Sequence, residues 1–244
     1  MAGRKGNGLG VSVVRLSELD GAWIESWLSP YRMSTYLRAG GSRAAALRLY
    51  EWNSEVAMAL HRDLCHFEIC VRNSYDHTLR NHWTGPGDWT DNPALAFPPV
   101  LRTRRGRGRP PVRVDINNKN RQLLAEAREK AGGANVAPGK VVAELGFGFW
   151  RYLTSSAHEA TLWTPVLHRA FPPGTDRARD VDRRIEKLHV LRNRVAHHEP
   201  LLNVDLQARL ADMLALASLL NPELAIYVDQ TTQLRRLAAI RASI

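Results

Sequence analysis

The stretch LHVLRNRVAHHEP, residues 188–200, is the most informative part of this chain. Apolar residues recur before it and within it at the spacing of one helical face, at Val181, Ile185, Leu188 and Val195. At about 100° per residue, Arg192 projects close to the middle of that face. An unpaired buried charge is very costly, so Arg192 must meet an ion partner, a substrate anion or a second subunit.

The same stretch predicts a helix end that brings an imidazole near a guanidinium. Helices usually end at or before the residue that precedes a proline, and Pro200 follows two histidines closely. His197 then lies in a last helical turn, where the helix dipole favours the imidazolium form. Arg192 offers a fork of N–H groups for phosphate oxygens, and Asn193 shares the side of His197. This combination suits phosphodiester cleavage, in which the imidazole moves a proton and the guanidinium stabilises developing charge.

Structural interpretations of these residues are also open. Arg192 would then form a buried ion pair with Glu68, and His197 would bond the last carbonyls of its helix. Glu68 and Arg72 have the i, i+4 spacing of a helical ion pair. The helix that carries Glu68 and Arg72 is otherwise apolar, which predicts that this pair is partly buried and supports the site. We expect Asn73 to support the site as well.

The sequence predicts neither a metal site nor a disulfide. Adjacent residues in the run 197–199 point apart on a helix, and the spacings of zinc proteases and zinc fingers do not occur. Cys65 and Cys70 lie five residues apart on a predicted helix and point to different sides. We therefore expect reduced thiols in a cytoplasmic protein, and no cofactor.

Composition points to a globular protein with a polyanionic partner. The chain has 244 residues, of which 44% are hydrophobic and 24% charged, and it contains no apolar run long enough to span a membrane. Its first nine residues lack the apolar core of a secretory signal. The net charge is +10 and the pI about 10.2, which favours nucleic acid as a partner and anionic membrane second.

The pattern predicts an all-α fold in one domain, residues 16–244, after a flexible lead, residues 1–15. Helix caps and apolar periodicity mark most of the boundaries. A helix beginning after a cap at Ser42 and ending near Arg80 is expected to be central and largely buried. The other expected helices are 17–26, 30–37, 118–131, 138–155, 157–170, a helix capped by Thr175 or Asp176 that carries the opening stretch, 203–219 and 222–241.

Residues 82–118 interrupt the helical pattern. They hold six of the thirteen prolines, so we expect a long, irregular, basic insertion. Glycine and proline separate its arginines and exclude a rigid helix, which leaves salt-dependent attraction of phosphates as their expected role. Trp83 and Trp89 either stack on bases or anchor the loop to the core. The candidate RNA-binding arginines are Arg102, Arg104, Arg105, Arg107, Arg109 and Arg113.

These residues resemble a known family. Residues 192–197 fit the HEPN pattern of an arginine, a polar residue and then a histidine after four to six intervening positions, and residues 191–200 resemble the C-terminal motif of its Abi-like (abortive infection) branch. The resemblance extends roughly from Asp20 to Leu220. Stretches similar to the N-terminal and middle signatures are YEWN (50–53) with FEICVRN (67–73), and LGFGFWR (145–151) followed by Trp163.

The resemblance implies an all-α HEPN-type helical bundle with additional helices and metal-independent endoribonuclease activity. By it, Arg192 polarises the scissile phosphate, His197 acts as general acid or base, and Asn193 orients the imidazole or the phosphate. His198 fits a five-residue gap and stays an alternative to His197. It further implies a homodimer with a composite site, a role as an abortive-infection or toxin-type defence protein, and restraint by a protein or small-RNA antitoxin. A non-catalytic RNA-binding module and a helical dimeric interaction protein are the alternatives.

Overall fold

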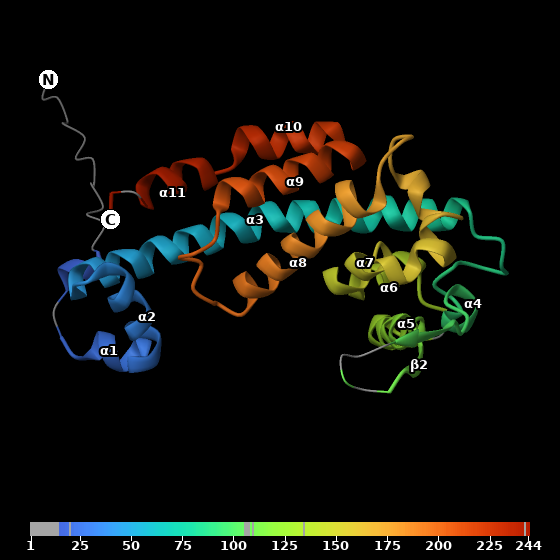
Figure 1. Cartoon of the computed structure of the whole chain (residues 1–244), viewed down its shortest axis with the longest axis horizontal. Coiled ribbons are helices and arrows are strands. Elements are labelled where there is room, and N and C mark those ends of the chain that lie inside the picture. The colour runs from blue at the N-terminus through green and yellow to red at the C-terminus, as the bar shows by residue number, and fades with distance from the viewer. Residues whose placement is uncertain (1–14, 20, 105–107, 109, 134, 242) are drawn as a thin grey trace, which may run out of the picture.

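One helix forms the spine of the molecule. The computed structural model describes residues 15–244 except 20, 105–107, 109, 134 and 242. Helix α3, Arg43–Asn81, begins at Ser42, whose hydroxyl accepts the Ala45 N–H at 3.2 Å, and its 39 residues span about 60 Å. The prediction of a long central helix is confirmed (Figure 1). Its buried apolar face includes Val56, Leu60, Leu64, Phe67 and Val71.

Along this spine pack α8 (Arg183–Ala196), α9 (Leu206–Leu220) and α11 (Leu234–Arg241), whereas α10 (Pro222–Thr231) packs mainly on α9 (Figure 1). Asp176 accepts the Arg179 N–H at 2.6 Å and begins a π-helical segment, Arg177–Asp182, that leads into α8. The single helix expected over 222–241 is wrong, because the chain breaks at Thr232, whose hydroxyl donates to buried Asp63 at 2.6 Å.

A small satellite core lies at the N-terminal end of α3 (Figure 1). It is built by a 3₁₀ turn (Leu16–Glu18), α1 (Trp23–Leu28) and α2 (Pro30–Gly40). The helix expected over 17–26 is wrong in its bounds because Gly21, with φ of 127°, interrupts it. The predicted end at Gly40–Gly41 is confirmed, since Gly41 adopts a left-handed conformation and donates to the Leu37 carbonyl at 2.8 Å.

The insertion over 82–118 is more ordered than predicted. It contains a short helix, α4 (Pro93–Ala96), and an antiparallel hairpin of β1 (Leu101–Arg104) and β2 (Val112–Asp115). The expectation of a wholly irregular loop is therefore wrong, because Val112–Asp115 pairs with β1 in an antiparallel register. In register, Arg102 lies opposite Val114 and Thr103 lies opposite Arg113.

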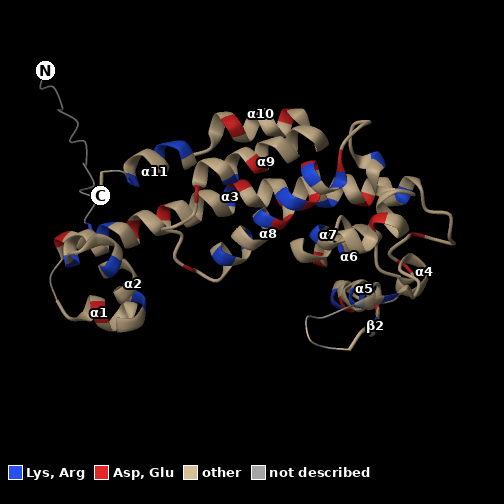
Figure 2. Cartoon of the chain, viewed as in Figure 1, with Lys and Arg blue, Asp and Glu red and all other residues tan. Residues whose placement is uncertain are grey.

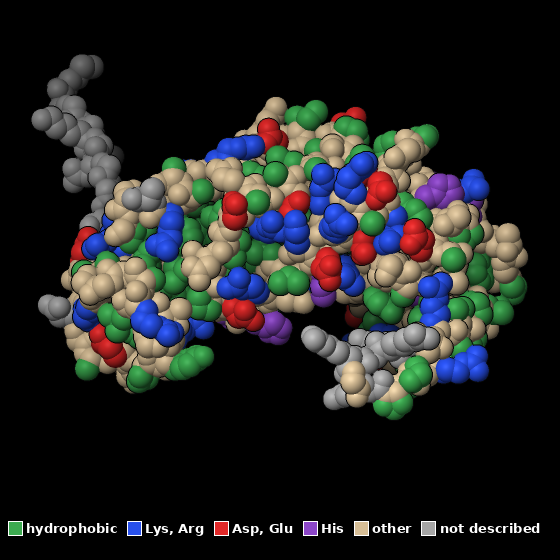
Figure 3. Space-filling model, viewed as in Figure 1, with side chains coloured by type: hydrophobic (Ala, Val, Ile, Leu, Met, Phe, Trp, Pro, Cys, Tyr) green, Lys and Arg blue, Asp and Glu red, His purple; other side chains and the backbone are tan. Residues whose placement is uncertain are grey.

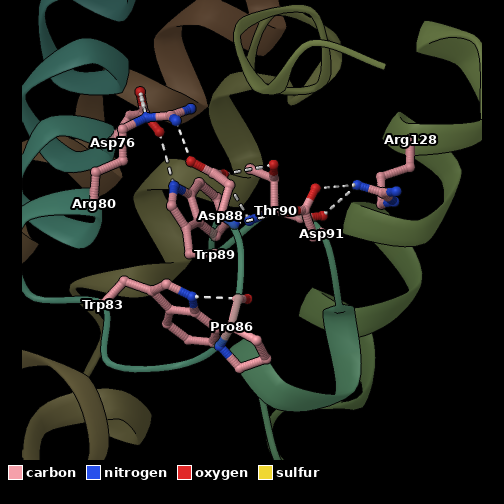
Figure 4. A network of polar contacts seen from close by, with 9 residues as sticks. All are labelled: Asp76, Arg80, Trp83, Pro86, Asp88, Trp89, Thr90, Asp91 and Arg128. Carbon is pink, nitrogen blue, oxygen red and sulfur yellow. Dashed lines mark hydrogen bonds and ion pairs between the residues drawn. The ribbon is translucent and has the colours of Figure 1, made fainter. Parts of the chain in front are cut away.

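A polar network attaches the start of this insertion to α3 (Figure 4). Trp89 is buried, and its indole N–H donates to Asp76 at 2.8 Å. Arg80 bonds Asp76 at 2.8 Å and also pairs with Asp88. Arg128 of the following helix donates to the Thr90 carbonyl at 2.9 Å. Trp89 therefore anchors the loop to the core and does not stack on bases.

The middle of the chain covers the other end of the spine (Figure 1). It contains α5 (Asn118–Ala131), α6 (Pro138–Glu144) and α7 (Phe147–Leu153), so the helix expected over 138–155 is broken at Leu145–Gly146. The helix expected over 157–170 is wrong as well. It is replaced by short 3₁₀ and π segments at Ser156–His158, Glu159–Trp163 and Leu167–Ala170.

The structure therefore agrees with an all-α fold, with one small hairpin added. No helix in the described part of the chain has the length and apolarity that crossing a membrane requires.

Candidate functional site

Helix α8 ends in a turn that separates its two terminal histidines. His197 is the last residue of the helical path, and His198 follows with φ of 54°, in the left-handed region. The His198 N–H donates to the Val195 carbonyl at 3.1 Å, and the Glu199 N–H donates to the Arg194 carbonyl at 2.9 Å. These two bonds define a Schellman motif, and an Arg194–Glu199 ion pair at 3.3 Å lies across the same turn. The predicted helix end before the proline is confirmed.

Two residues from distant helices hold this turn in place. Arg32 of α2 donates to the His198 carbonyl. Asn53 of α3 is buried, and its side-chain oxygen accepts the N–H of buried Leu201 at 2.6 Å. Because these partners lie 166 and 148 residues apart in sequence, sequence reasoning did not identify Arg32 and Asn53 as site residues.

Arg192 lies beside Glu68 but stays accessible. The distance from its Nε to Glu68 Oε2 is 3.5 Å, and the two side chains are 40% and 24% exposed. The predicted pairing with Glu68 is confirmed, whereas the expectation of a buried charge is wrong. Exposed ion pairs of this kind contribute about 0–1 kcal/mol. Among the described residues the other N–H groups of this guanidinium have no partner, so they are free to bind an anion.

A groove lies between α3 and the end of α8. A pocket of about 310 Å³ touches Arg192, and a neighbouring pocket of about 630 Å³ touches Arg32 and His198. Both pockets are lined by His61, Val195 and Ala196, so they adjoin, and we refer to the two together as the groove. His197 is exposed and does not line either pocket.

His61 is a functional candidate that sequence reasoning missed. It is exposed on α3 and is the titratable side chain that lines both pockets of the groove. Glu68 and Arg72 line the smaller pocket from the same helix. The spacing of His61 and Glu68, seven residues or two helical turns, was the available signal that they share one face.

The structure revises two predicted supporting contacts. The side chain of Asn193 bonds His189, four residues earlier on α8, at 3.3 Å. Asn193 therefore does not orient His197. Among the described residues no ion pair joins Glu68 to Arg72, because Glu68 pairs with Arg192. Arg72 donates instead to the side chain of its neighbour Asn73 at 3.3 Å. That contact places exposed Asn73 beside the smaller pocket without lining it.

The hairpin arginines do not line the groove. Arg102 and Arg113 are exposed, and the strand register places them on opposite faces of the hairpin. Arg104 belongs to β1. The remaining candidates, Arg105, Arg107 and Arg109, lie outside the described residues.

A second basic cluster gathers over α8. Figure 2 shows Lys and Arg along this helix, and Figure 3 shows basic side chains collected on the same face. Asp212 of α9 has three cationic neighbours, Arg184, Lys187 and Arg209, at 3.8, 3.9 and 3.0 Å. Arg184 has a second carboxylate, Asp180, at 3.8 Å. Within this cluster three cations face two carboxylates, and the excess of positive charge favours a polyanion.

Among the described residues no group of three or more His, Cys, Asp or Glu side chains is arranged to hold a metal ion. Both cysteines are free, as predicted, with Cys65 exposed and Cys70 half-buried. Comparison of the chain with protein-family models, curated proteins and solved structures found no match. The HEPN-type arrangement and its activity therefore stay predictions.

Proposed function

We propose that this protein is a metal-independent endoribonuclease of the Abi-like HEPN type, acting in abortive infection. The observation that carries the proposal is the groove at the end of α8. There, the half-exposed Arg192 has N–H groups free for an anion, and His198 lines the adjoining pocket. A fixed cation and an imidazole on one groove are the groups that phosphodiester cleavage needs.

The reaction assigns one role to each group. A ribose 2′-oxygen attacks the adjacent phosphorus, its proton passes to an imidazole, and the bond from phosphorus to the 5′-oxygen breaks. The leaving 5′-oxygen takes up a proton, so the products are a 2′,3′-cyclic phosphate and a 5′-hydroxyl. Arg192 stabilises the charge that develops on the phosphoryl oxygens. The motif resemblance assigns the proton transfer to His197, which lines neither pocket, and His198 is the alternative because it lines the groove.

A homodimer fits this site. On α3, Met58 lines the pocket of His198 and Ile69 lines the pocket of Arg192, and they are 72% and 40% exposed. A second copy of the chain would cover these side chains and bring its own Arg192 to the same groove, which would give a composite site. A protein or small-RNA antitoxin could restrain the enzyme by occupying the same surface.

The test is RNA cleavage in the presence of EDTA. We expect the wild-type protein to cut single-stranded RNA and Arg192→Ala and His197→Ala to lose cleavage while keeping their helical content and their oligomeric state. Arg183→Ala is the matched control, because it removes an exposed arginine of the same helix that lines neither pocket. Cleavage at the wild-type rate by both site variants contradicts the proposal. Loss in His198→Ala with retention in His197→Ala transfers the proton-moving role to His198.

A non-catalytic RNA-binding module is the second candidate. The basic cluster around Asp212 favours it, because that cluster offers phosphate contacts without an imidazole. It predicts salt-sensitive binding of RNA that stays intact after long incubation. The third candidate, a helical dimeric interaction protein, predicts that Arg192→Ala shifts the oligomeric state and leaves RNA binding unchanged.

A further inference from the structure

A separate pocket of about 570 Å³ lies between α5, the α6–α7 turn and α8. It shares no lining residue with the groove at Arg192 and His198. Its size is that of a site for a drug-sized molecule. His189, the hydrogen-bond partner of Asn193, contributes the α8 side of its wall.

The walls combine apolar and aromatic side chains. Leu123 and Ala127 come from α5, and Phe149 and Tyr152 come from α7. Gly148 also lines the pocket, and a Cβ at this position would lie 3.2 Å from His189 Nε2, so the glycine lets the imidazole sit close to the wall. Phenyl, phenol and imidazole rings around one pocket suit a flat ring, because unstacked bases bind against such side chains.

One buried polar group in this pocket lacks a partner. Asn120 lines the pocket and is 0% exposed. Its Nδ2 bonds His158 Nε2 at 3.1 Å, and its Oδ1 has no hydrogen-bond partner. Burial, with a contribution from Arg102, lowers the pKa of His158 to about 4, so that imidazole is neutral near pH 7 and can accept from the amide. A buried acceptor left unpaired costs about 1–3 kcal/mol, which a ligand with an N–H donor would recover once the Asn120 side chain turns and brings Oδ1, now closed to solvent, to the pocket wall.

The charges around the pocket are balanced. Lys119 and Lys130 are exposed on the lining face of α5, and the carboxylates of Glu126 and Glu144 line the same pocket. Arg151 also lines the pocket, and its charge is balanced by Glu186, which lies outside the lining at 2.6 Å. A pocket with as many acidic as free basic groups favours a ligand ring that carries no net charge.

We propose that this pocket binds a nucleobase, either in a free nucleoside or as an unstacked base of single-stranded RNA, with an N–H of the base donating to Asn120. The base lies against the aromatic wall formed by Phe149, Tyr152 and His189. This inference goes beyond the proposed function and stands without it, because it depends on no property of Arg192, His197 or His198.

The test is calorimetric titration of the full chain with adenosine and with purine riboside, which lacks the exocyclic amino group. We expect saturable adenosine binding and binding of purine riboside about tenfold weaker, since one neutral hydrogen bond is lost. Leu123→Trp fills the pocket and is expected to abolish binding. Gln122→Trp is the matched control, because it adds the same side chain at an exposed position of α5 outside the pocket.

A second titration, with RNA, distinguishes a free nucleoside from a base of single-stranded RNA. A short single-stranded RNA whose binding weakens in Leu123→Trp and is displaced by adenosine identifies a base of a strand. Adenosine binding with no effect of Leu123→Trp on RNA binding identifies a free nucleoside. The proposal is overturned if neither nucleosides nor RNA bind saturably at millimolar concentration, or if Leu123→Trp binds as well as Gln122→Trp while both melt cooperatively. Neither result bears on RNA cleavage by the separate groove.

Discussion

Replacing His158 by glutamine is expected to remove part of the acid sensitivity of this fold. His158 is 1% exposed, and its Nε2 lies 3.1 Å from Asn120 Nδ2. Burial in the first place, and the nearby Arg102 in the second, lower its pKa from the ordinary value of 6.5 to about 4. Glutamine keeps an oxygen acceptor for the Asn120 amide and carries no titrating group.

The sign and size follow from proton linkage. Between pH 6.5 and about 4 an unfolded chain binds a proton at His158 that the folded protein does not bind, so falling pH favours the unfolded state. Each tenfold difference in proton affinity corresponds to about 1.4 kcal/mol. The contribution of neutral His158 to the free energy of unfolding is therefore fully present above pH 6.5, and about 3 kcal/mol of it is lost as the pH falls through 4.

The assay is urea unfolding followed by far-ultraviolet circular dichroism at several pH values from 7.5 to 4. The free energy of unfolding of the wild type should fall about 3 kcal/mol further over this range than that of His158→Gln. His77→Gln, which removes an exposed histidine of α3, should follow the wild type. Parallel pH dependences for the wild type and His158→Gln would refute the reasoning, whatever their absolute stabilities.

Three further predictions concern the groove. His198→Gly should raise the free energy of unfolding, measured by urea titration, by about 0.5–1 kcal/mol, because glycine adopts the left-handed conformation without steric cost. A lower stability of this variant would contradict the prediction. Asn53→Ala should lower the same free energy by about 1–3 kcal/mol, since the buried Leu201 N–H loses its acceptor, and an unchanged value would show that water replaces it. Mass spectrometry after brief maleimide treatment should find Cys65 labelled before Cys70, because burial raises the pKa of the Cys70 thiol and lowers its thiolate fraction; equal rates would exclude this ordering.

Local signals explain what could be predicted of the fold. The cap at Ser42, the glycine pair before it and the apolar periodicity of α3 lie within one continuous segment, so both ends of the spine were predictable. The helix break at Thr232 was missed, because a contact from a distant part of the chain, the hydrogen bond from Thr232 to Asp63, decides it. The break at Gly146 is local: Gly146 is extended, and Trp150 donates to the Leu145 carbonyl five residues before it at 3.1 Å.

For the candidate site, too, local signals predict only what lies within one stretch of the sequence. The end of α8 was predictable because the proline lies in the same stretch as the motif. Asn193 was assigned to the wrong imidazole, since His189 and His197 both lie four residues away and spacing alone cannot choose between them. The contact of Arg32 with His198 joins residues that are 166 positions apart, a pairing that no local pattern encodes.

Product ends measured in EDTA test the central claim most directly. Single-stranded RNA is incubated with the wild-type protein and with Arg192→Ala, and the ends of any fragments are identified by mass spectrometry. The account predicts wild-type fragments that end in 2′,3′-cyclic phosphate and begin with 5′-hydroxyl, and intact RNA with Arg192→Ala. Intact RNA with the wild-type protein, or the same fragments at the same rate with Arg192→Ala, would contradict it.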